Sequence, residues 1–213
     1  MMNLRAMMMS GGDGERAAGR RWMVLLLGGL TLFVFGGGGV LLITVVQERE
    51  LWAVITGGRP WWLHVALGIA AGLVIGLSAR TLVRSPWMRE LDERFARRIG
   101  DRIAHPVDRV FLSLCAGVGE ELFFRGALQH WLGLLPTAVV FVAVHGYLDP
   151  RDRRLFVYGL LLTAAMAGLG WMARTFGLAA PMLAHALIDV VLFEQLWRTY
   201  RRSMEGDQRP GYL

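Results

Sequence analysis

The chain of 213 residues has no lysine, a single cysteine and few charged residues. The lone Cys115 excludes an intramolecular disulfide and a zinc site built from cysteines. Charged residues make up 19% and hydrophobic residues 54%, against roughly 25% charged in soluble domains. Disorder of the whole chain is excluded, because disordered segments are poor in apolar residues. The net charge of +6 comes from arginine alone, so the arginine positions decide between a nucleic-acid and a membrane surface.

The sequence contains several long apolar segments. A helix that spans a bilayer needs roughly 20 mostly apolar residues. Segments 22–46, 61–79 and 155–173 have about this length and contain no charged residue. Three further apolar segments contain ionisable residues: 110–135, 136–148 and 178–197. The sequence therefore predicts an all-α polytopic membrane bundle of about six transmembrane helices.

The arginines are divided unequally between the two sides of this bundle. They gather in the N-terminal tail, in 80–102, in 149–154 and in the C-terminal tail, whereas the other side receives only Arg49, Arg59 and Arg174. Positive residues mark cytoplasmic loops. Both termini are therefore expected to be cytoplasmic, and no nucleic-acid partner is expected.

The segment 87–103 mixes arginines with apolar residues. The apolar residues recur every four positions, which places them on one side of a helix: Leu91, Phe95, Ile99 and Ile103. We expect an amphipathic helix on the cytoplasmic face of the membrane, with a solvated connector helix as the alternative.

Glycine has two local patterns within the predicted spans. Gly68, Gly72 and Gly76 repeat every four residues, a small-residue stripe that allows close helix contact. Residues 36–39 are four consecutive glycines in the first span, where they are expected to loosen or bend the helix.

Residues 21–205 are expected to form one transmembrane domain, with flexible tails at 1–20 and 206–213. The first apolar run is longer than the ~7–15-residue core of a signal peptide. No pair of small residues suited to cleavage follows before Gln47. A retained membrane anchor is therefore predicted.

Several ionisable side chains lie inside predicted spans, where each costs roughly 2.5–3.5 kcal/mol and is usually kept for function. In each span they are three or four residues from a partner on the same helix face. The sets are Glu120, Glu121 and Arg125 in the third span, Phe141 and His145 in the fourth, and His185 and Asp189 in the sixth.

The expected depths of these residues agree. A rise of about 1.5 Å per residue places Glu120, His145, His185 and Asp189 about 10–20 Å along their helices, in the middle of a core about 30 Å thick. A single interior cluster is predicted, since separate buried charges would cost more. Glu121 and Arg125 are four residues apart, so an ion pair is expected between them.

Such a cluster suits hydrolysis. A carboxylate can serve as a general base for water, an imidazole can hold that water, and another polar group can stabilise the oxyanion that forms on a cleaved carbonyl. Alternatively, Glu120, His145 and His185 could ligate zinc and leave a position open for water. The residues by themselves leave both mechanisms open.

The three motifs Glu120-Glu121-x-x-x-Arg125, Phe141-x-x-x-His145 and His185-x-x-x-Asp189 occur in this order on separate predicted helices. In this they resemble the CPBP family of intramembrane proteases, the CAAX prenyl-protease-like and bacteriocin-processing enzymes often called Abi proteins. The resemblance covers about residues 107–198. It implies an intramembrane endopeptidase, with a glutamate mechanism favoured over a metalloprotease and no cofactor favoured over zinc.

The resemblance also implies roles by position. Glu120 matches the general base, with Glu121 and Arg125 as its supporting pair. His145 matches the histidine that helps to hold water, and His185 the one that stabilises the oxyanion.

Two further positions complete the three motifs. Phe141 is expected to pack beside the site. Asp189 stands where the family often has Asn, and an ionised Asp cannot donate a hydrogen bond, so Asp189 would act protonated or through His185. Cys115 lies about 140° around the helix from Glu120, which argues against a thiol mechanism.

The expected substrate is a membrane-associated protein or peptide in contact with the bilayer. A prenylated peptide, a bacteriocin leader and a C-terminal sorting signal, the last cleaved near the C-terminus, all remain open. The arginine-only basic set is typical of a GC-rich bacterial genome, and a multi-pass protein of the bacterial inner membrane is expected.

Two other function classes fit buried ionisable residues. A proton-coupled carrier would use them as a relay, and it predicts paired repeats with broken helices at matching positions, which the sequence does not display. A non-catalytic scaffold or immunity protein would tolerate replacement of Glu120 and His145.

Overall fold

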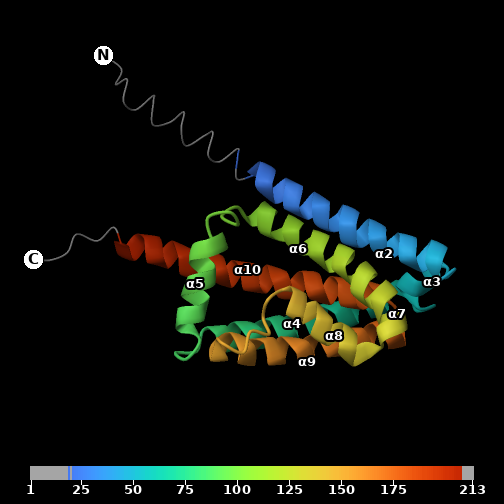
Figure 1. Cartoon of the computed structure of the whole chain (residues 1–213). Helices are drawn as coiled ribbons and strands as arrows, with labels where there is room; N and C mark the ends of the chain where they lie inside the picture. The colour runs from blue at the N-terminus through green and yellow to red at the C-terminus, as the bar shows by residue number, and fades with distance from the viewer. Residues whose placement is uncertain (1–18, 20, 208–213) are drawn as a thin grey trace, which may run out of the picture.

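The computed structural model describes residue 19 and residues 21–207. Regular structure in this part of the chain is entirely helical (Figure 1), which confirms the all-α prediction. The first membrane helix runs over Arg21–Val46 and contains η1 (Leu32–Gly37), α2 (Gly38–Leu41) and η2 (Leu42–Val46). The later elements are α3 (Leu51–Thr56), α4 (Trp61–Val83), α5 (Arg89–Ile99), α6 (Pro106–Glu120), η3 (Glu121–Leu128), α7 (Gln129–Leu132), α8 (Leu134–Val144), α9 (Arg153–Phe176) and α10 (Ala179–Asp207). Apart from residues 19, 206 and 207, the predicted tails lie outside the described residues.

Among the described residues, four helices are long and apolar enough to cross a membrane. They are Arg21–Val46, Trp61–Val83, Arg153–Phe176 and Ala179–Glu205, and they match the first, second, fifth and sixth predicted spans. The third predicted span lies in a continuous helical run over 106–132 that contains more charged residues. The count of six crossings therefore stays a prediction, while the multi-pass helical architecture is confirmed.

The fourth predicted span, 136–148, is only partly helical. Helix α8 has 11 residues and ends at Val144, so it is about 16 Å long at about 1.5 Å per residue. That is about half of a core of about 30 Å. The chain continues without regular helix over 145–152 to the start of α9. The expectation of a helix over the whole segment is wrong, because a glycine-terminated cap stops it.

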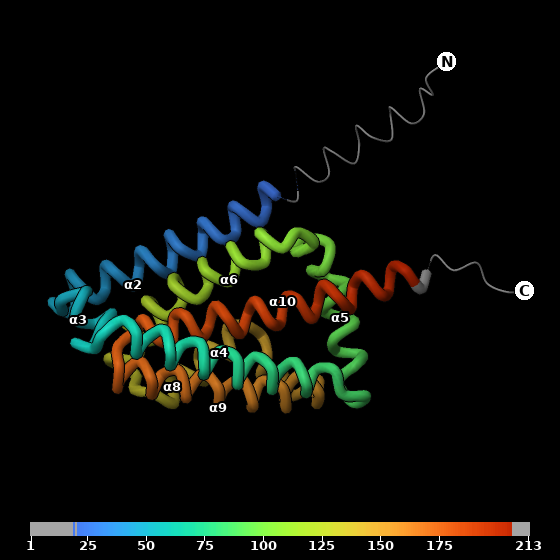
Figure 2. The backbone as a smooth tube through the Cα atoms, turned by 180° about the vertical axis from the view of Figure 1, so that it is seen from behind, coloured from blue at the N-terminus to red at the C-terminus, as the bar shows by residue number. Residues whose placement is uncertain are grey.

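Helix α10 lies in the middle of the bundle. It contacts α4, α6, α5 and α9, and it runs between the first helix with α6 on one side and α4, α8 and α9 on the other (Figures 1 and 2). The start of the first helix, the end of α10 and α5 all lie at one end of the bundle (Figure 1). The placement of both termini on the cytoplasmic side stays a prediction.

The predicted glycine stripe on α4 faces α10. A Cβ on Gly68 would lie 2.8 Å from the Leu183 Cβ, and one on Gly72 would lie 2.7 Å from the Leu187 Cβ. Because these glycine positions of α4 have no side chain, α10 can approach the α4 backbone there, as the small-residue spacing predicts.

Gly72→Ala is accordingly expected to destabilise the bundle by about 1–3 kcal/mol, because the added methyl group overpacks the helix contact. The midpoint of thermal unfolding in detergent measures the change. Gly37→Ala is the matched control, since a Cβ there meets nothing within 4 Å. Equal midpoints for the two variants would contradict the tight α4–α10 contact.

The glycines of the first helix serve close packing as well. A Cβ on Gly39 would lie 2.6 Å from the carbonyl carbon of Leu122. The helix remains continuous through 36–39, with π-helical turns at Leu32–Gly37 and Leu42–Val46. The glycines therefore seat the first helix directly against η3, rather than interrupting the span.

The amphipathic segment forms α5, and its apolar face packs against the protein. Met88 and Leu91 are buried with Val83 and Tyr158, and α5 lies across α10 (Figure 1). Ion pairs also join α5 to the start of α9, Arg94 with Asp152 and Glu90 with Arg154. Helix α5 therefore closes one end of the bundle.

The Arg94–Asp152 pair makes this closure sensitive to acid. The hydrogen bond from Arg94, followed by those from backbone amides, holds the pKa of Asp152 below its usual value. The pair therefore stabilises the fold above the unfolded pKa of about 3.9, and this contribution is lost as the pH falls through the lower folded pKa.

Asp152→Asn retains an oxygen that can cap α9 but removes the charge. We expect wild type to be more stable than this variant by up to about 1 kcal/mol at pH 6, and the difference to close as the pH falls below about 4. Unfolding midpoints at pH 6 and pH 3 measure it. A difference that is the same at both pH values would contradict the ionic origin.

Candidate active site

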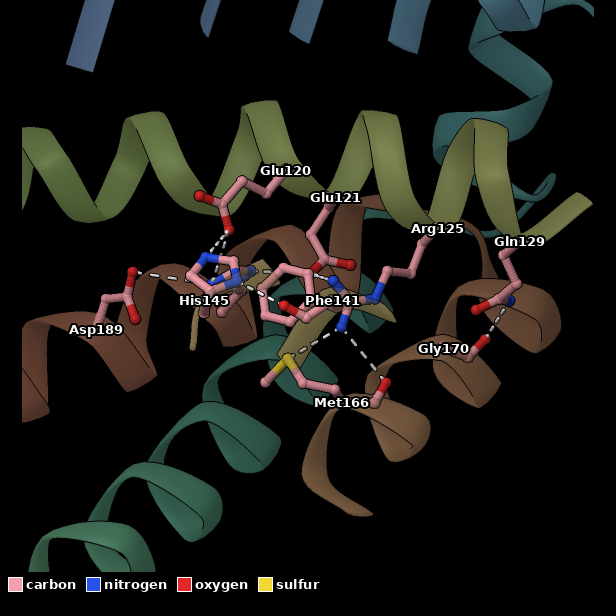
Figure 3. A network of polar contacts seen from close by, with 10 residues as sticks. Glu120, Glu121, Arg125, Gln129, Phe141, His145, Met166, Gly170 and Asp189 are labelled. Atoms are coloured by element: carbon pink, nitrogen blue, oxygen red, sulfur yellow. Dashed lines mark hydrogen bonds and ion pairs between the residues drawn. The ribbon is translucent and has the colours of Figure 1, made fainter. Parts of the chain in front are cut away.

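Three separate elements bring the predicted polar residues together. The run α6–η3 supplies Glu120, Glu121 and Arg125, the end of α8 supplies His145, and α10 supplies His185 and Asp189. Figure 3 shows the side chains that it labels from this set converging between the helices: Glu120, Glu121, Arg125, His145 and Asp189. The residues lie far apart in the sequence, so the cluster exists only because α10 packs between the other helices.

Glu120 is at the centre of the accessible part of this cluster. Its Oε2 lies 3.6 Å from His145 Nε2 and 3.9 Å from His185 Nε2. The second carboxylate, Asp189, places Oδ2 3.8 Å from the same His185 nitrogen. The side chains of Glu120, Asp189 and His145 are 12%, 23% and 35% exposed. A small molecule such as water therefore has access to the carboxylate that faces both imidazoles.

A fully buried charged layer lies behind these groups. Glu121 Oε1 is 3.0 Å from Arg125 Nη1 and 2.9 Å from His185 Nδ1. The predicted Glu121–Arg125 ion pair is therefore present. Its carboxylate holds His185, whereas the resemblance had assigned the pair to the support of Glu120. When Nδ1 of His185 donates to Glu121, Nε2 is free to interact with groups on the side facing Glu120.

Phe141 and Met166 complete the surroundings of Arg125. The guanidinium carbon lies 4.4 Å from the centre of the Phe141 ring, and Nη2 donates to the Met166 sulfur at 2.9 Å. The Phe141 carbonyl accepts a hydrogen bond from His145 Nδ1 at 2.6 Å. Phe141 therefore packs beside the site, as expected, and its backbone orients His145.

A glycine-terminated helix end places His145. The amide of Gly146 donates to Ala143 O at 2.9 Å, and that of Tyr147 donates to Val142 O at 3.2 Å. Together with a φ of 78° at Gly146, these bonds form a Schellman cap. His145 is consequently the C-cap residue of α8 and turns its imidazole toward Glu120.

Gly146→Ala is expected to cost about 1–2 kcal/mol, because a residue with a Cβ is strained in the left-handed conformation. It should also lower any activity that depends on His145. Gly146→Asn should be tolerated better, since Asn adopts this conformation more readily. Unfolding midpoints compare the two variants, with helical Gly168→Ala as the control, and equal losses for Ala and Asn would contradict the cap.

Sequence reasoning missed the π-helical turns of η3. They begin at Glu121, directly after Glu120, and such turns are frequent at functional sites. The side chains of Gln47 and Arg49 donate to Ala127 O at 3.0 Å and Gly126 O at 2.9 Å. In the sequence, the only signal for these contacts was that Gln47 and Arg49 are polar residues just after the first span. Their spacing does not reveal that their partners are carbonyl groups of η3.

Other ionisable residues lie away from the cluster. Cys115 faces the first helix, since a Cβ on Gly28 would lie 3.1 Å from its sulfur. The imidazole of His105 caps α6 by accepting from Val107 N. Glu194 meets arginines, with 3.0 Å to Arg109 Nη2. His64 is buried, with Nε2 3.0 Å from Thr56 O.

Metal-ligand geometry is a separate question from residue type. Within residues 21–207, no group of three or more His, Cys, Asp or Glu side chains is placed to hold a metal ion. The expectation of no cofactor, with zinc as the alternative, stays a prediction.

Comparison with known proteins finds a family similar to the segment that contains this site. Residues 103–191 match the family model described as type II CAAX prenyl endopeptidase Rce1-like. The matched segment contains all seven residues of the three motifs. Residues 103–191 are therefore similar to this family. The match agrees with the CAAX-protease-like resemblance and, with the four apolar helices, identifies a multi-pass membrane protein.

A curated relative is also similar to part of the chain. The chain is 36% identical over 100 residues to "Uncharacterized protein YpbD" of Bacillus subtilis (strain 168), which covers 46% of this chain and 51% of that protein. The chain thus matches about half of this relative's length. The comparison with solved structures found no significant match.

Proposed function

We propose that this protein is an intramembrane endopeptidase in which Glu120 activates water. One observation carries the proposal: a partly exposed carboxylate faces two imidazoles, and a fully buried Glu121–Arg125 pair fixes the second of them. The Rce1-like match supports the same reaction class. The carrier and scaffold alternatives give no reason for this arrangement of a base and two histidines.

The reaction begins with water held between Glu120 and His145. Because the Glu120 Oε2 to His145 Nε2 distance is 3.6 Å, longer than a direct hydrogen bond, a water beside both groups would be held by each. Glu120 takes a proton as the water oxygen attacks the peptide carbonyl carbon. It returns that proton to the departing amine nitrogen when the C–N bond breaks.

His185 would stabilise the oxyanion that forms in between. The Glu121 carboxylate fixes its Nδ1, so a protonated Nε2 can donate to the negative oxygen. Asp189, 3.8 Å from that nitrogen, would act through His185 by stabilising its cationic form. In this scheme Glu120, His145 and His185 are catalytic residues, while Glu121, Arg125, Phe141 and Asp189 are positioning residues.

The substrate would be a membrane-associated protein or peptide whose extended backbone enters between the helices. Cleavage near its C-terminus, in a bacterial inner membrane, is the setting that we propose. Prenylated peptides, leader peptides and C-terminal sorting signals are the three substrate classes to compare.

Reconstituted protein incubated with one peptide of each class in H₂¹⁸O tests the reaction. We expect one class to yield a product whose new carboxyl group contains one ¹⁸O, with no product from Glu120→Gln. The exposed carboxylate Glu93, on α5, provides the control Glu93→Gln. Equal cleavage by the Glu120→Gln preparation would contradict the proposal.

A chelator arm distinguishes glutamate chemistry from a zinc-dependent version that uses Glu120, His145 and His185. We expect activity to persist after dialysis against 1,10-phenanthroline. Loss of activity that added zinc restores would overturn the glutamate mechanism and leave the protease assignment intact.

A further inference from the structure

A basic cavity lies at the opposite end of the bundle from α5. Its volume is about 630 Å³, within the range of about 300–1,000 Å³ typical of ligand sites. It is bounded by α3, α7 and the end of α9, and its polar lining residues include Arg49, Arg125, Gln129, His130 and Arg174. None of the described residues that line it is Asp or Glu.

The arginines of this cavity are not explained by membrane topology. On the side of the bundle where few positive residues are expected, the connections contain Arg49, Arg59 and Arg174. Two of these three, Arg49 and Arg174, line this one cavity. Arginine on this side does not serve orientation, so its concentration around a cavity indicates a ligand.

Two of the three arginines that line the cavity have no ion-pair partner in the described residues. Arg125 is paired with Glu121, but Arg49 uses only Nη1, which donates to Gln47 and to Gly126 O. Within the described part of the chain, the side chain of Arg174 makes no hydrogen bond or ion pair, although its backbone lies in α9. Since a guanidinium has five N–H donors, these two arginines together present several free donors and two uncompensated charges to the cavity.

Exposed tryptophans place this end at a membrane–water interface. Five of them lie on α3, the start of α4, α7 and the last part of α9, each more than half exposed: Trp52, Trp61, Trp62, Trp131 and Trp171. Tryptophan gathers where lipid headgroups lie. Trp131 also lines the cavity, so the cavity opens at the level of the headgroups.

We propose that this cavity binds the phosphate of an anionic phospholipid headgroup. The planar guanidinium forks of Arg49 and Arg174 suit phosphate oxygens, and Gln129, His130 and Thr175 supply further polar groups for the headgroup. The acyl chains would extend along the apolar outer surface beside Trp131. This binding does not depend on the protease reaction.

Native mass spectrometry of the purified full chain with dihexanoyl phosphatidylglycerol tests the proposal. Arg174→Gln is the main variant, because Arg174 is exposed. Arg59→Gln is the matched control, since Arg59 lies on the same side outside the cavity. We expect Arg174→Gln to weaken binding about tenfold and Arg59→Gln less than twofold, with unfolding midpoints of both variants near wild type.

Three further probes identify the source of the anion. Dihexanoylglycerol, which lacks the phosphate, and inorganic phosphate should each bind at least tenfold more weakly than the lipid. Equal binding of dihexanoylglycerol would reduce the site to an apolar groove, and equal binding of inorganic phosphate would make it a phosphate site. Either of these two results would overturn the lipid assignment. Equal effects of Arg174→Gln and Arg59→Gln on binding would overturn it as well. So would a peptide with a free C-terminal carboxylate that binds more tightly than the lipid and depends on Arg174.

Discussion

Glu121→Gln is expected to destabilise the folded bundle by about 3–5 kcal/mol, the cost of leaving a buried charge without its partner. The side chains of Glu121 and Arg125 are 0% and 1% exposed, so water cannot replace the lost carboxylate. His185 would lose the anion at its Nδ1 as well. Unfolding titrations in mixed micelles measure the change in free energy.

Two further variants control this result. Glu93→Gln removes an exposed carboxylate that faces Arg89 and Arg97 at 3.9 and 3.8 Å, and it should cost less than about 1 kcal/mol. The double variant Glu121→Gln/Arg125→Met removes both buried charges and should recover much of the lost stability. A single Glu121→Gln variant as stable as wild type would contradict the buried ion pair.

Glu120→Gln is expected to lower turnover by about 10²–10⁴-fold, the usual contribution of a general base, while the fold remains intact. Glu120 is 12% exposed and faces its histidines at 3.6 and 3.9 Å, so an amide of the same shape should fit. Single-turnover rates with the cleaved peptide, measured beside the unfolding midpoint, separate the two effects.

Glu120→Asp sharpens this test. It keeps the carboxylate but withdraws it by one methylene group, so partial activity is expected. A Glu120→Gln enzyme with wild-type turnover would exclude Glu120 as the base. A Glu120→Gln protein that fails to fold would instead make Glu120 structural.

The membrane helices could be predicted because composition alone determines them. Apolar runs such as 22–46 and 61–79 are long enough to span a bilayer whatever their neighbours are, and the structure has helices at both. The contact face of the α4 glycines could also be predicted, because the spacing of residues on one helix determines which of them share a face.

The site was predictable only in part. The i,i+4 pair of Glu121 and Arg125 follows from helix geometry and is present. That Glu121 also holds His185 depends on how η3 and α10 pack, which spacing within one helix does not contain. The end of α8 at Val144 depends on the left-handed Gly146, a short-range signal hidden within an apolar run.

The basic cavity could likewise be predicted only in part from the sequence. Arg49 and Arg174 could be counted on the sparsely positive side from the sequence. Their convergence depends on α3 docking against the α9–α10 connection, where Leu178 N donates to Val54 O at 3.1 Å. Such long-range contacts are set by tertiary packing rather than by a sequence period.

The most direct test of the central claim compares protein termini in cells that express wild type or Glu120→Gln at equal levels. Mass spectrometry of the membrane fraction identifies new N- and C-termini. We predict termini that appear only with wild type, map to a membrane-associated protein and disappear with the folded Glu120→Gln variant. Identical termini in both strains, with the variant folded and inserted, would contradict a protease whose base is Glu120.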